Sequence, residues 1–286
     1  MRERSGIMTL IMNKLNTAER VQIIAALVEG NSVNSVCRMT GRSIHTVLKL
    51  LVDAGTACKA FHDAKVRNLK TKRLQADEIW NFCYAKEKNV PAEFKGQFGY
   101  GDCWTWVGID ADSKLIISYL TTSTRDGGHA HEFMRDIAGR LANRVQVTTD
   151  GLNAYWDAVC NVFSCNVDFA QLIKIYGPDY AGEGKYSPAE CVGIKVKTRT
   201  GDPDPAHIST SFVERSNLTM RMNMRRFTRL TNGFSKKVEN MQHAVALNFF
   251  HYNFCRLHKT LRVTPAMEAG LTDHVWEIEN LVELLD

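Results

Sequence analysis

The stretch LQADEIWNFCY, residues 74–84, decides the fold of this 286-residue chain. It is rich in aromatic and β-branched residues, which predicts a strand. Further strands are predicted over 104–109 and 115–121, and the polar residues 110–114 between them predict a turn. We expect these three strands to form an antiparallel meander.

After the meander the predicted elements alternate between helix and strand. They are a helix over 130–142, a strand over 145–149, a helix over 154–163, a strand over 167–175, a basic helix from about 211 and a helix over about 236–256. This order is typical of the ribonuclease H-like fold, an α/β architecture in which helices flank a mixed sheet. Residues 177–210 are rich in Pro and Gly and are expected to be an irregular excursion.

The first part of the chain has a different pattern, because residues 17–54 predict three short helices. Thr17, Ser32 and Ser43 are suitable N-cap residues, and a turn at Gly41 separates the last two helices. Two short helices joined in this way are typical of a helix-turn-helix. Its second helix would enter the major groove of DNA, and the candidate DNA contacts are Arg42, Ser43, His45, Thr46 and Lys49. The alternative is an ordinary small helical bundle.

The uneven charge of the chain favours a polyanionic partner. The net charge is only +5, but residues 1–75 hold 13 basic and 5 acidic side chains, and residues 215–262 hold 10 and 1. These blocks suggest a helix-turn-helix domain over 1–60 (with 1–11 as a candidate upstream extension), a basic linker over 61–72, a catalytic domain over 73–256 and an acidic tail over 257–286. The tail is expected to be a solvated helix, and the alternative is that it shields the basic surface in the absence of DNA.

Composition also bears on the compartment. No apolar run approaches the ~18 residues of a membrane span, so no membrane partner is expected. The eight cysteines form no CxxC motif and lie in apolar segments, which predicts reduced, buried thiols and a cytoplasmic protein. A zinc site built from Cys160, Cys165, Cys191 and His207 is a weak alternative, since their spacing fits no common zinc motif.

Three carboxylates are placed to converge in the predicted fold. Asp77 lies in the first strand, Asp150 follows the fourth, and Glu214 lies near the start of the basic helix. Their mutual repulsion calls for divalent cations, and carboxylate oxygens suit Mg²⁺ or Mn²⁺. Two such ions support phosphodiester chemistry. Alternation puts Asp77 on the more polar face of its strand and Glu78 on the apolar face, where a basic partner is expected for Glu78.

The helix that carries Glu214 also carries candidate phosphate-binding residues. Arg221 and Arg225 follow Glu214 at i+7 and i+11, which would place them on its face of the helix, and Arg215 enlarges the basic surface. The alternative is a solvated amphipathic helix whose methionines pack inward.

Four segments together resemble a known family. They are DEIW (77–80), TTDG (148–151), STSFVERSNLTMRMNMRRFTRLTNGFSKK (209–237) and YNFCRLHKTLRVTPAMEAG (252–270). Their order and spacing are similar to those of bacterial DDE transposases of the insertion sequence one family, from about residue 12 to the end. The resemblance implies a catalytic triad of Asp77, Asp150 and Glu214.

The resemblance also implies an activity and partners. The activity is metal-dependent cleavage and strand transfer at the ends of a transposable element, which is DNA recombination by transposition. The partners would be double-stranded terminal inverted repeats, target DNA, and a second copy of the chain or a larger synaptic assembly.

Other readings remain open at this point. One is a domesticated helix-turn-helix regulator without catalysis. Another is a nuclease on the same fold that cuts without joining. A third is a recombinase with a covalent tyrosine, suggested by Tyr252, Arg256, His258 and Arg262, although Tyr252 precedes its partners in an unusual order.

Overall fold

A six-stranded mixed sheet forms the centre of the computed structural model, which describes residues 14–177 and 190–286. Its strands, in the spatial order β3-β2-β1-β4-β5-β6, are β1 (Arg73–Cys83), β2 (Gly101–Asp110), β3 (Ile116–Thr122), β4 (Gln146–Thr149), β5 (Asp168–Tyr176) and β6 (Cys191–Thr200). The pairs β1–β4 and β4–β5 are parallel, and the other three are antiparallel. The predicted meander and mixed α/β sheet are therefore confirmed. The candidate extension over 1–11 lies outside the described residues.

The sixth strand corrects one expectation. The segment 177–210 was expected to be irregular; its residues 178–189 lie outside the described part, but 191–200 form β6, which pairs with β5 from Phe169↔Thr200 to Tyr176↔Cys191. The alternation of Val192, Ile194 and Val196 was the available signal. These side chains stay between 44% and 63% exposed, so the strand is not held by a buried face but by its backbone pairing with β5.

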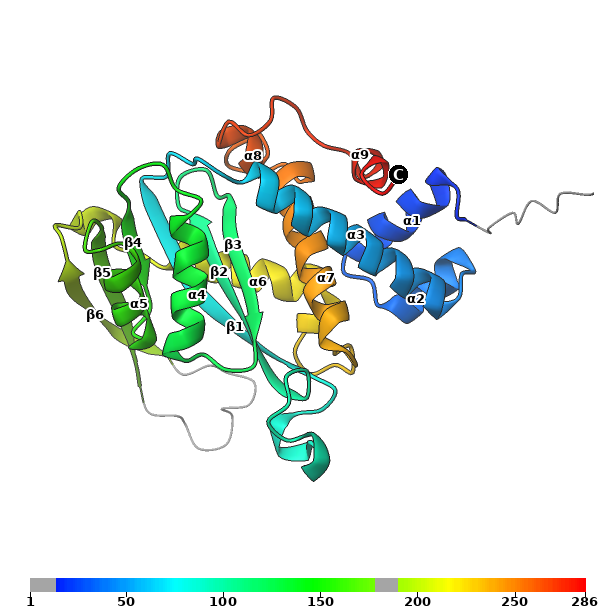
Figure 1. The fold of residues 1–286 in the computed structure, drawn as a ribbon, viewed down its shortest axis with the longest axis horizontal. Helices are drawn as coiled ribbons and strands as arrows, with labels where there is room; N and C mark the ends of the chain where they lie inside the picture. Colours follow the sequence, from blue (N-terminus) through cyan, green and yellow to red (C-terminus); the bar gives the residue numbers. More distant parts are fainter. Residues whose placement is uncertain (1–13, 178–189) are drawn as a thin grey trace, which may run out of the picture.

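Helices cover both faces of the sheet (Figure 1). On one face lie α4 (Gly127–Ala138) and α5 (Ala154–Val162); on the other lie α6 (Ser211–Asn223) and α7 (Val238–Phe250), which runs into a π-helical turn over His251–Cys255. Neighbouring residues of β2 show the two layers. Trp106 packs against Phe133 of α4 and Tyr155 of α5, whereas Val107 belongs to the core that includes Val213 of α6. The flanking helices thereby bury both faces of the sheet at β2.

The N-terminal segment forms the three expected helices, α1 (Thr17–Val28), α2 (Val33–Thr40) and α3 (Ile44–Lys65). Ser32 and Ser43 are N-caps as predicted, but α1 is capped by Asn16, whose side chain forms a capping box with Glu19, and not by Thr17. Gly41 ends α2 in the left-handed conformation, with φ +68°.

The third helix continues to Lys65, through the first five residues of the expected basic linker. It does so because its buried stripe persists: Ala54, Cys58 and His62 follow Leu51 at helical spacing and are all buried. This stripe packs α3 against α7, so the N-terminal helices share a hydrophobic core with the sheet-containing part.

Helices α3 and α7 approach each other closely at Gly55. A Cβ atom there would lie 2.5 Å from the Cβ of His243 and 2.6 Å from its backbone. We therefore expect Gly55→Ala to push the helices apart and to lower the free energy of unfolding by about 1–3 kcal/mol, the usual range for overpacking. Thermal denaturation would measure this. Gly127→Ala is the control, since its Cβ meets nothing within 4 Å; equal melting temperatures for both variants would contradict the prediction.

The acidic C-terminal segment is not a solvated helix, so that expectation is wrong. It contains α8 (Pro265–Glu268) and α9 (Ile278–Glu283), and Leu281 and Val282 of α9 are fully buried against the N-terminal helices. The Asp286 carboxylate accepts hydrogen bonds from both terminal nitrogens of Arg20, at 3.1 and 3.0 Å. The segment is therefore amphipathic: its apolar side chains pack against the N-terminal helices, and its acidic side chains lie on the other side.

Neither a membrane span nor a disulfide is found in the described part of the chain. No helix there is long and apolar enough to cross a membrane. All eight cysteines are free, but Cys165 and Cys191 are exposed, so the prediction of buried thiols fails for these two.

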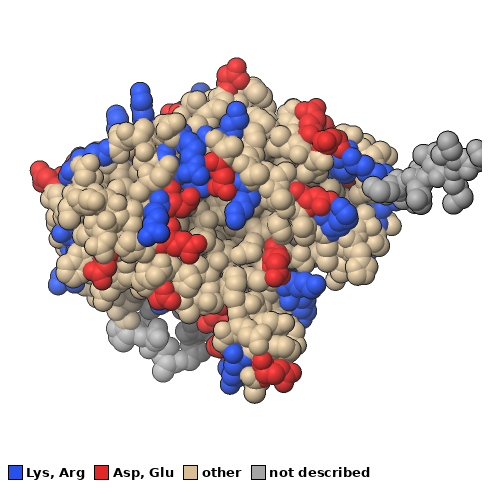
Figure 2. Space-filling model, viewed as in Figure 1, with Lys and Arg blue, Asp and Glu red and all other residues tan. Residues whose placement is uncertain are grey.

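On the face covered by α3 and α4, basic and acidic side chains are interspersed rather than gathered into one patch (Figure 2).

Candidate active site

Three carboxylates meet where β1 and β4 run side by side. The last registered pair of these parallel strands is Ala76↔Thr149, so Asp77 on β1 and Asp150 directly after β4 both follow this pair. Glu78 joins them: one carboxylate oxygen from each of the three residues lies within 4.8 Å of the others. The structure thus brings together two of the three predicted acids, with Glu78 as the third member of the cluster.

The side chain of Asp77 faces α6, which is anchored to the same strand. The side chain of Gln75, two residues earlier on β1, accepts hydrogen bonds from the backbone N–H groups of Phe212 and Val213 at 2.8 and 3.1 Å. This contact satisfies free donors at the N-terminus of α6. Further along, the Asn217 amide donates to Asp77 at 2.9 Å. The helix therefore lies along β1 with its polar side towards the carboxylates.

Glu214 lies near this cluster but is held by other partners. It is on the first turn of α6, one turn before Asn217, and its negative charge contributes to the raised pKa of Asp77. One carboxylate oxygen accepts a hydrogen bond from Thr210 at 2.7 Å, and the other forms an ion pair with Lys174 of β5. Glu214 therefore lies at the rim of the site with its charge compensated by Lys174.

Glu78 points towards the opposite face of the sheet. Tyr155 of α5 is close to its carboxyl group, and the Glu78 Oε1 atom is buried without a hydrogen-bond partner in the described part of the chain. Burial raises the pKa of Glu78 to about 8, and the charges of Asp150 and Asp77 add to the shift. The expected ion pair of Glu78 with a basic side chain is not found in the described part of the chain: the charge of Arg125 acts on Glu78, but its close carboxylate neighbours are Asp77 and Asp150. The reason is that Asp150 follows the end of β4, where carboxylates from both faces of β1 can approach it.

The electrostatics of the cluster are unfavourable for the ionised protein alone. Burial raises the pKa of Asp77 to about 7, and the negative charge of Asp150 raises it further than that of Glu214 does. Like charges held this close cannot all ionise at neutral pH without compensation. The oxygen-only donor set, partly buried and converging on one point, fits a hard divalent cation such as Mg²⁺ or Mn²⁺.

The predicted phosphate-binding residues occupy different positions around α6. Arg215 is exposed on the helix, and Arg221 is half-buried and close enough to Asp77 for their charges to interact. Arg225 is not on the helical face of Glu214, which corrects that expectation. The helix ends at Asn223 because Met224 adopts an extended conformation, and Arg225 begins a separate 3₁₀ turn.

The candidate DNA contacts gather at the start of α3. Arg42, Ser43, His45 and Lys49 are exposed and Thr46 is half-buried. Several have internal partners: Arg42 pairs with Glu19 of α1, the Ser43 hydroxyl accepts a hydrogen bond from the Thr46 backbone at 3.2 Å, and Lys49 pairs with Asp53 at 2.6 Å. His45 is an exposed side chain on the first turn of α3.

Sequence reasoning missed four residues of the site: Gln75, Lys174, Asn217 and Tyr155. Asn217 could have been found, because it lies three residues after Glu214 and so shares its helical face. Lys174 and Tyr155 carried no signal of their own, since their role follows from the pairing of β5 with β4 and from the packing of α5. The alternative zinc site is not supported, because the acidic cluster is the sole group of three or more potential metal ligands found among the described residues.

Comparison with known proteins gives similarity at the level of structure only. No known protein family and no curated protein matches the sequence. Among solved structures, a chain of the intasome of simian T-cell lymphotropic virus in complex with PP2A regulatory subunit B56 gamma is similar at 13% identity and TM-score 0.41, over 83% of this chain and 70% of that chain. A chain of the piggyBac transposase synaptic complex with hairpin DNA is similar at 11% identity and TM-score 0.43, over 94% and 69%.

The Mos1 transposase paired-end complex with left transposon end is similar at 13% identity and TM-score 0.25, over 59% of this chain and 61% of that chain. All three TM-scores lie below 0.5, so the function of this chain is argued from its own residues.

Proposed function

We propose that this chain is a DDE transposase of the ribonuclease H-like fold, which cleaves and joins phosphodiester bonds at the ends of an insertion sequence with the help of divalent metal ions. The observation that carries the proposal is the partly buried cluster formed by two acids in the middle of β1 and one directly after β4, with Glu214 beside it on α6. Asp77, Asp150 and Glu214 are the proposed catalytic and metal-binding residues. Glu78 is a candidate fourth acid.

The donor chemistry fits the metal that this activity needs. Asp77 and Asp150 would hold the ions most directly, and Glu214 would complete a second position once it leaves Lys174. Two divalent ions, Mg²⁺ or Mn²⁺, would supply activation of the attacking oxygen and neutralise charge on the leaving oxygen.

The protein itself would contribute binding and orientation. Asn217 orients Asp77, and Gln75 fixes α6 against β1. Arg221 and Arg215 would grip phosphates beside the scissile bond. Water would form a bond to the phosphorus at the element end while the bond to the 3′ oxygen breaks, which frees a 3′ hydroxyl. That hydroxyl would then form a bond to a phosphorus of target DNA while the bond from this phosphorus to the 3′ oxygen of the target strand breaks, with positioning supplying much of the rate.

The N-terminal helices would recognise the terminal inverted repeats as a helix-turn-helix. The support is the α2–turn–α3 geometry with exposed polar residues at the start of α3. Because two ends of an element must be brought together, a homodimer or a larger synaptic assembly is the proposed form on DNA.

An assay of cutting and joining tests the function. The full chain is incubated with Mg²⁺ and labelled DNA that carries the repeats flanking its own gene, together with a plasmid target. Cleaved ends joined to the plasmid support a transposase. Cleavage without joining would indicate a nuclease, and binding without either reaction would indicate a regulator.

The two candidate glutamates can be separated by matched variants. We expect Glu214→Gln to reduce strand cleavage by at least about tenfold, or ~1.4 kcal/mol of transition-state stabilisation, because glutamine is a poorer ligand for a hard cation. Glu78→Gln is expected to retain more activity, since Glu78 lies on the opposite face of the sheet from α6. Initial cleavage rates at saturating Mg²⁺ measure both. A larger loss in Glu78→Gln would reassign the third acid to Glu78.

The tyrosine recombinase alternative is disfavoured by the surroundings of Tyr252. Its ring packs against the core between α6 and α7, and burial raises the pKa of its hydroxyl to about 12. A covalent nucleophile needs access to DNA and a nearby base, and Tyr252 is placed as a packing residue.

A further inference from the structure

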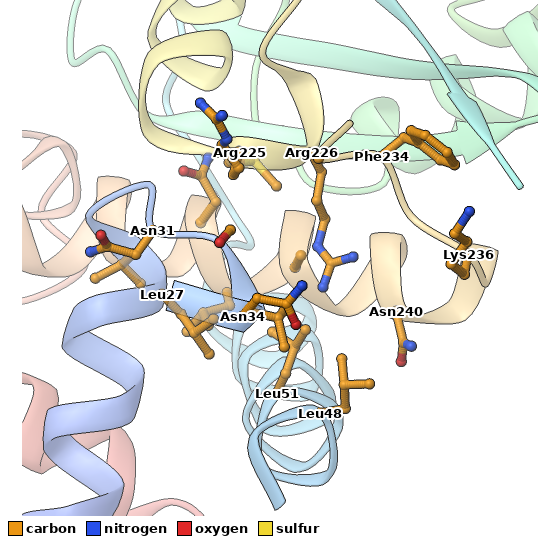
Figure 3. Close-up of a pocket in the computed structure, with 18 of the residues that line it drawn as sticks. Leu27, Asn31, Asn34, Leu48, Leu51, Arg225, Arg226, Phe234, Lys236 and Asn240 are labelled. Carbon is orange, nitrogen blue, oxygen red and sulfur yellow. The ribbon is translucent and has the colours of Figure 1, made fainter. Parts of the chain in front are cut away.

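A pocket lies between the N-terminal helices and the segment that follows α6, apart from the carboxylate cluster. Its volume is about 350 Å³, which is within the size range of small-ligand sites. Leu27 of α1 and Leu48 and Leu51 of α3 form an apolar side, and the chain from Asn223 to Lys236 forms the opposite wall (Figure 3). The pocket therefore joins the start of α3 to the C-terminal end of the helix that carries Glu214.

The charges around the pocket have one sign. Arg225, Arg226 and Lys236 line it, and none of its lining residues is acidic. Arg226 reaches from the upper wall towards Asn34 (Figure 3). Its Nη1 atom donates to the Ser235 hydroxyl at 2.8 Å, but its Nη2 atom is buried with no hydrogen-bond partner in the described part of the chain. Burial also lowers the pKa of Arg226 to about 10. A buried guanidinium with a free donor favours an anionic group.

The remaining lining residues indicate more than a bare anion. Six asparagines line the pocket, and Asn34 and Asn240 approach it from α2 and α7. An amide offers both donors and acceptors, which matches the edge of a nucleobase and exceeds what a phosphate alone can use. The leucine side supplies apolar surface for a planar group. Cations, amides and apolar surface in one pocket of this size match a nucleotide.

We propose that this pocket binds one unpaired nucleotide of the DNA, with its phosphate at Arg226 and its base among the asparagines and leucines. The inference rests on the proposed function, because it assigns the pocket to a strand that passes from α3 towards Asp77. It adds a position at which the protein holds a nucleotide out of the duplex, separate from the acids that react.

Binding of mononucleotides to the full-length protein tests the pocket directly, without metal and without catalysis. Isothermal titration with the four deoxynucleoside monophosphates is compared with the matching nucleosides and with inorganic phosphate. We expect the monophosphates to bind at least tenfold more tightly than either partial ligand. A short duplex with one unpaired nucleotide should displace the monophosphate, and a fully paired duplex should not.

Two variants locate the binding, and each has a matched control. Arg226→Met removes the buried charge, and Asn34→Asp introduces a carboxylate on an exposed helix without a change in size. Both should weaken monophosphate binding at least tenfold. Lys59→Met and Asn89→Asp make the same kinds of change outside the pocket and should leave binding unaltered. If Arg226→Met fails to fold, Asn34→Asp decides the question alone.

Several results would overturn the inference: no binding of monophosphates at millimolar concentration, equal binding of inorganic phosphate, or full binding by Asn34→Asp. A protein that cleaves and joins DNA but binds no monophosphate would refute the pocket and keep the proposed function. A protein that binds monophosphates through Arg226 and Asn34 but neither cleaves nor joins DNA would do the reverse.

Discussion

Asp150→Asn should abolish metal-dependent strand cleavage and leave binding of the terminal repeats intact. Asp150 belongs to the cluster, in which one carboxylate oxygen each of Asp77, Glu78 and Asp150 lie within 4.8 Å of one another. An amide removes one negative charge at that point and with it much of the affinity for a divalent cation. We expect a rate loss of at least about 100-fold, or ~2.7 kcal/mol of transition-state stabilisation. Gel assays of cleavage and of repeat binding on the same preparation measure the two effects.

The matched control is Asp157→Asn, which removes an exposed carboxylate on α5 a short distance along the chain. It should cleave like the unmodified protein. Cleavage by Asp150→Asn at a comparable rate would exclude the carboxylate cluster from catalysis. Loss of repeat binding in Asp150→Asn would show that the substitution damages the fold or that the N-terminal helices depend on the site.

The second large effect is on stability. We expect it to increase when a proposed catalytic carboxylate is removed, although activity should decrease. Asp77→Asn is expected to stabilise the metal-free protein at pH 8. Burial and the charge of Asp150 raise the pKa of Asp77 from 3.8 to about 7 in the folded protein. Between about pH 4 and pH 7, the folded state therefore holds a proton that the unfolded state has released. Stability is therefore lost as the pH rises from about 4 to about 7, by up to about 4 kcal/mol. Asparagine does not titrate, so the stability of the Asp77→Asn variant does not decrease in this way as the pH rises.

Thermal denaturation in a chelating buffer measures this effect. The melting temperature of Asp77→Asn should exceed that of the unmodified protein at pH 8, and the difference should shrink towards pH 4. Addition of Mg²⁺ at pH 8 should raise the melting temperature of the unmodified protein more than that of the variant, because a ligand that binds the folded state stabilises it. Asp157→Asn should show neither trend. A variant that melts lower than the unmodified protein at every pH would contradict the prediction.

Much of the sheet could be predicted from local patterns. The strand at 74–84, the two that pair with it and the alternation of helix and strand after residue 127 all have patterns that reflect burial on known faces. β6 was not predicted, because its apolar side chains are exposed and because the surrounding Pro and Gly residues suggested a loop. The length of α3 escaped because its buried stripe beyond Leu51 includes Gly55 and His62, which are weak markers of a core.

The site was predictable in the same uneven way. Asp77 and Asp150 follow from the adjacency of two parallel strands, which is a property of the fold class. The place of Glu78 depends on where β4 ends, and the ion pair of Glu214 with Lys174 depends on the reach of two side chains from different elements. Neither the place of Glu78 nor this ion pair produces a periodic pattern in the sequence. The end of α6 at Asn223 removed Arg225 from the expected face for the same reason, since one backbone conformation at Met224 redirects the chain.

The packing of α9 against the first helices has a consequence for how the protein is made. Leu281, Val282 and Asp286 complete a bundle whose other members, α1 to α3, are near the start of the chain. A ribosome therefore releases those helices more than 200 residues before their last partner is synthesised. A translation product that lacks α9 would have an apolar gap where Leu281 and Val282 belong, so the segment proposed to recognise DNA would reach its full stability only after α9 has been synthesised.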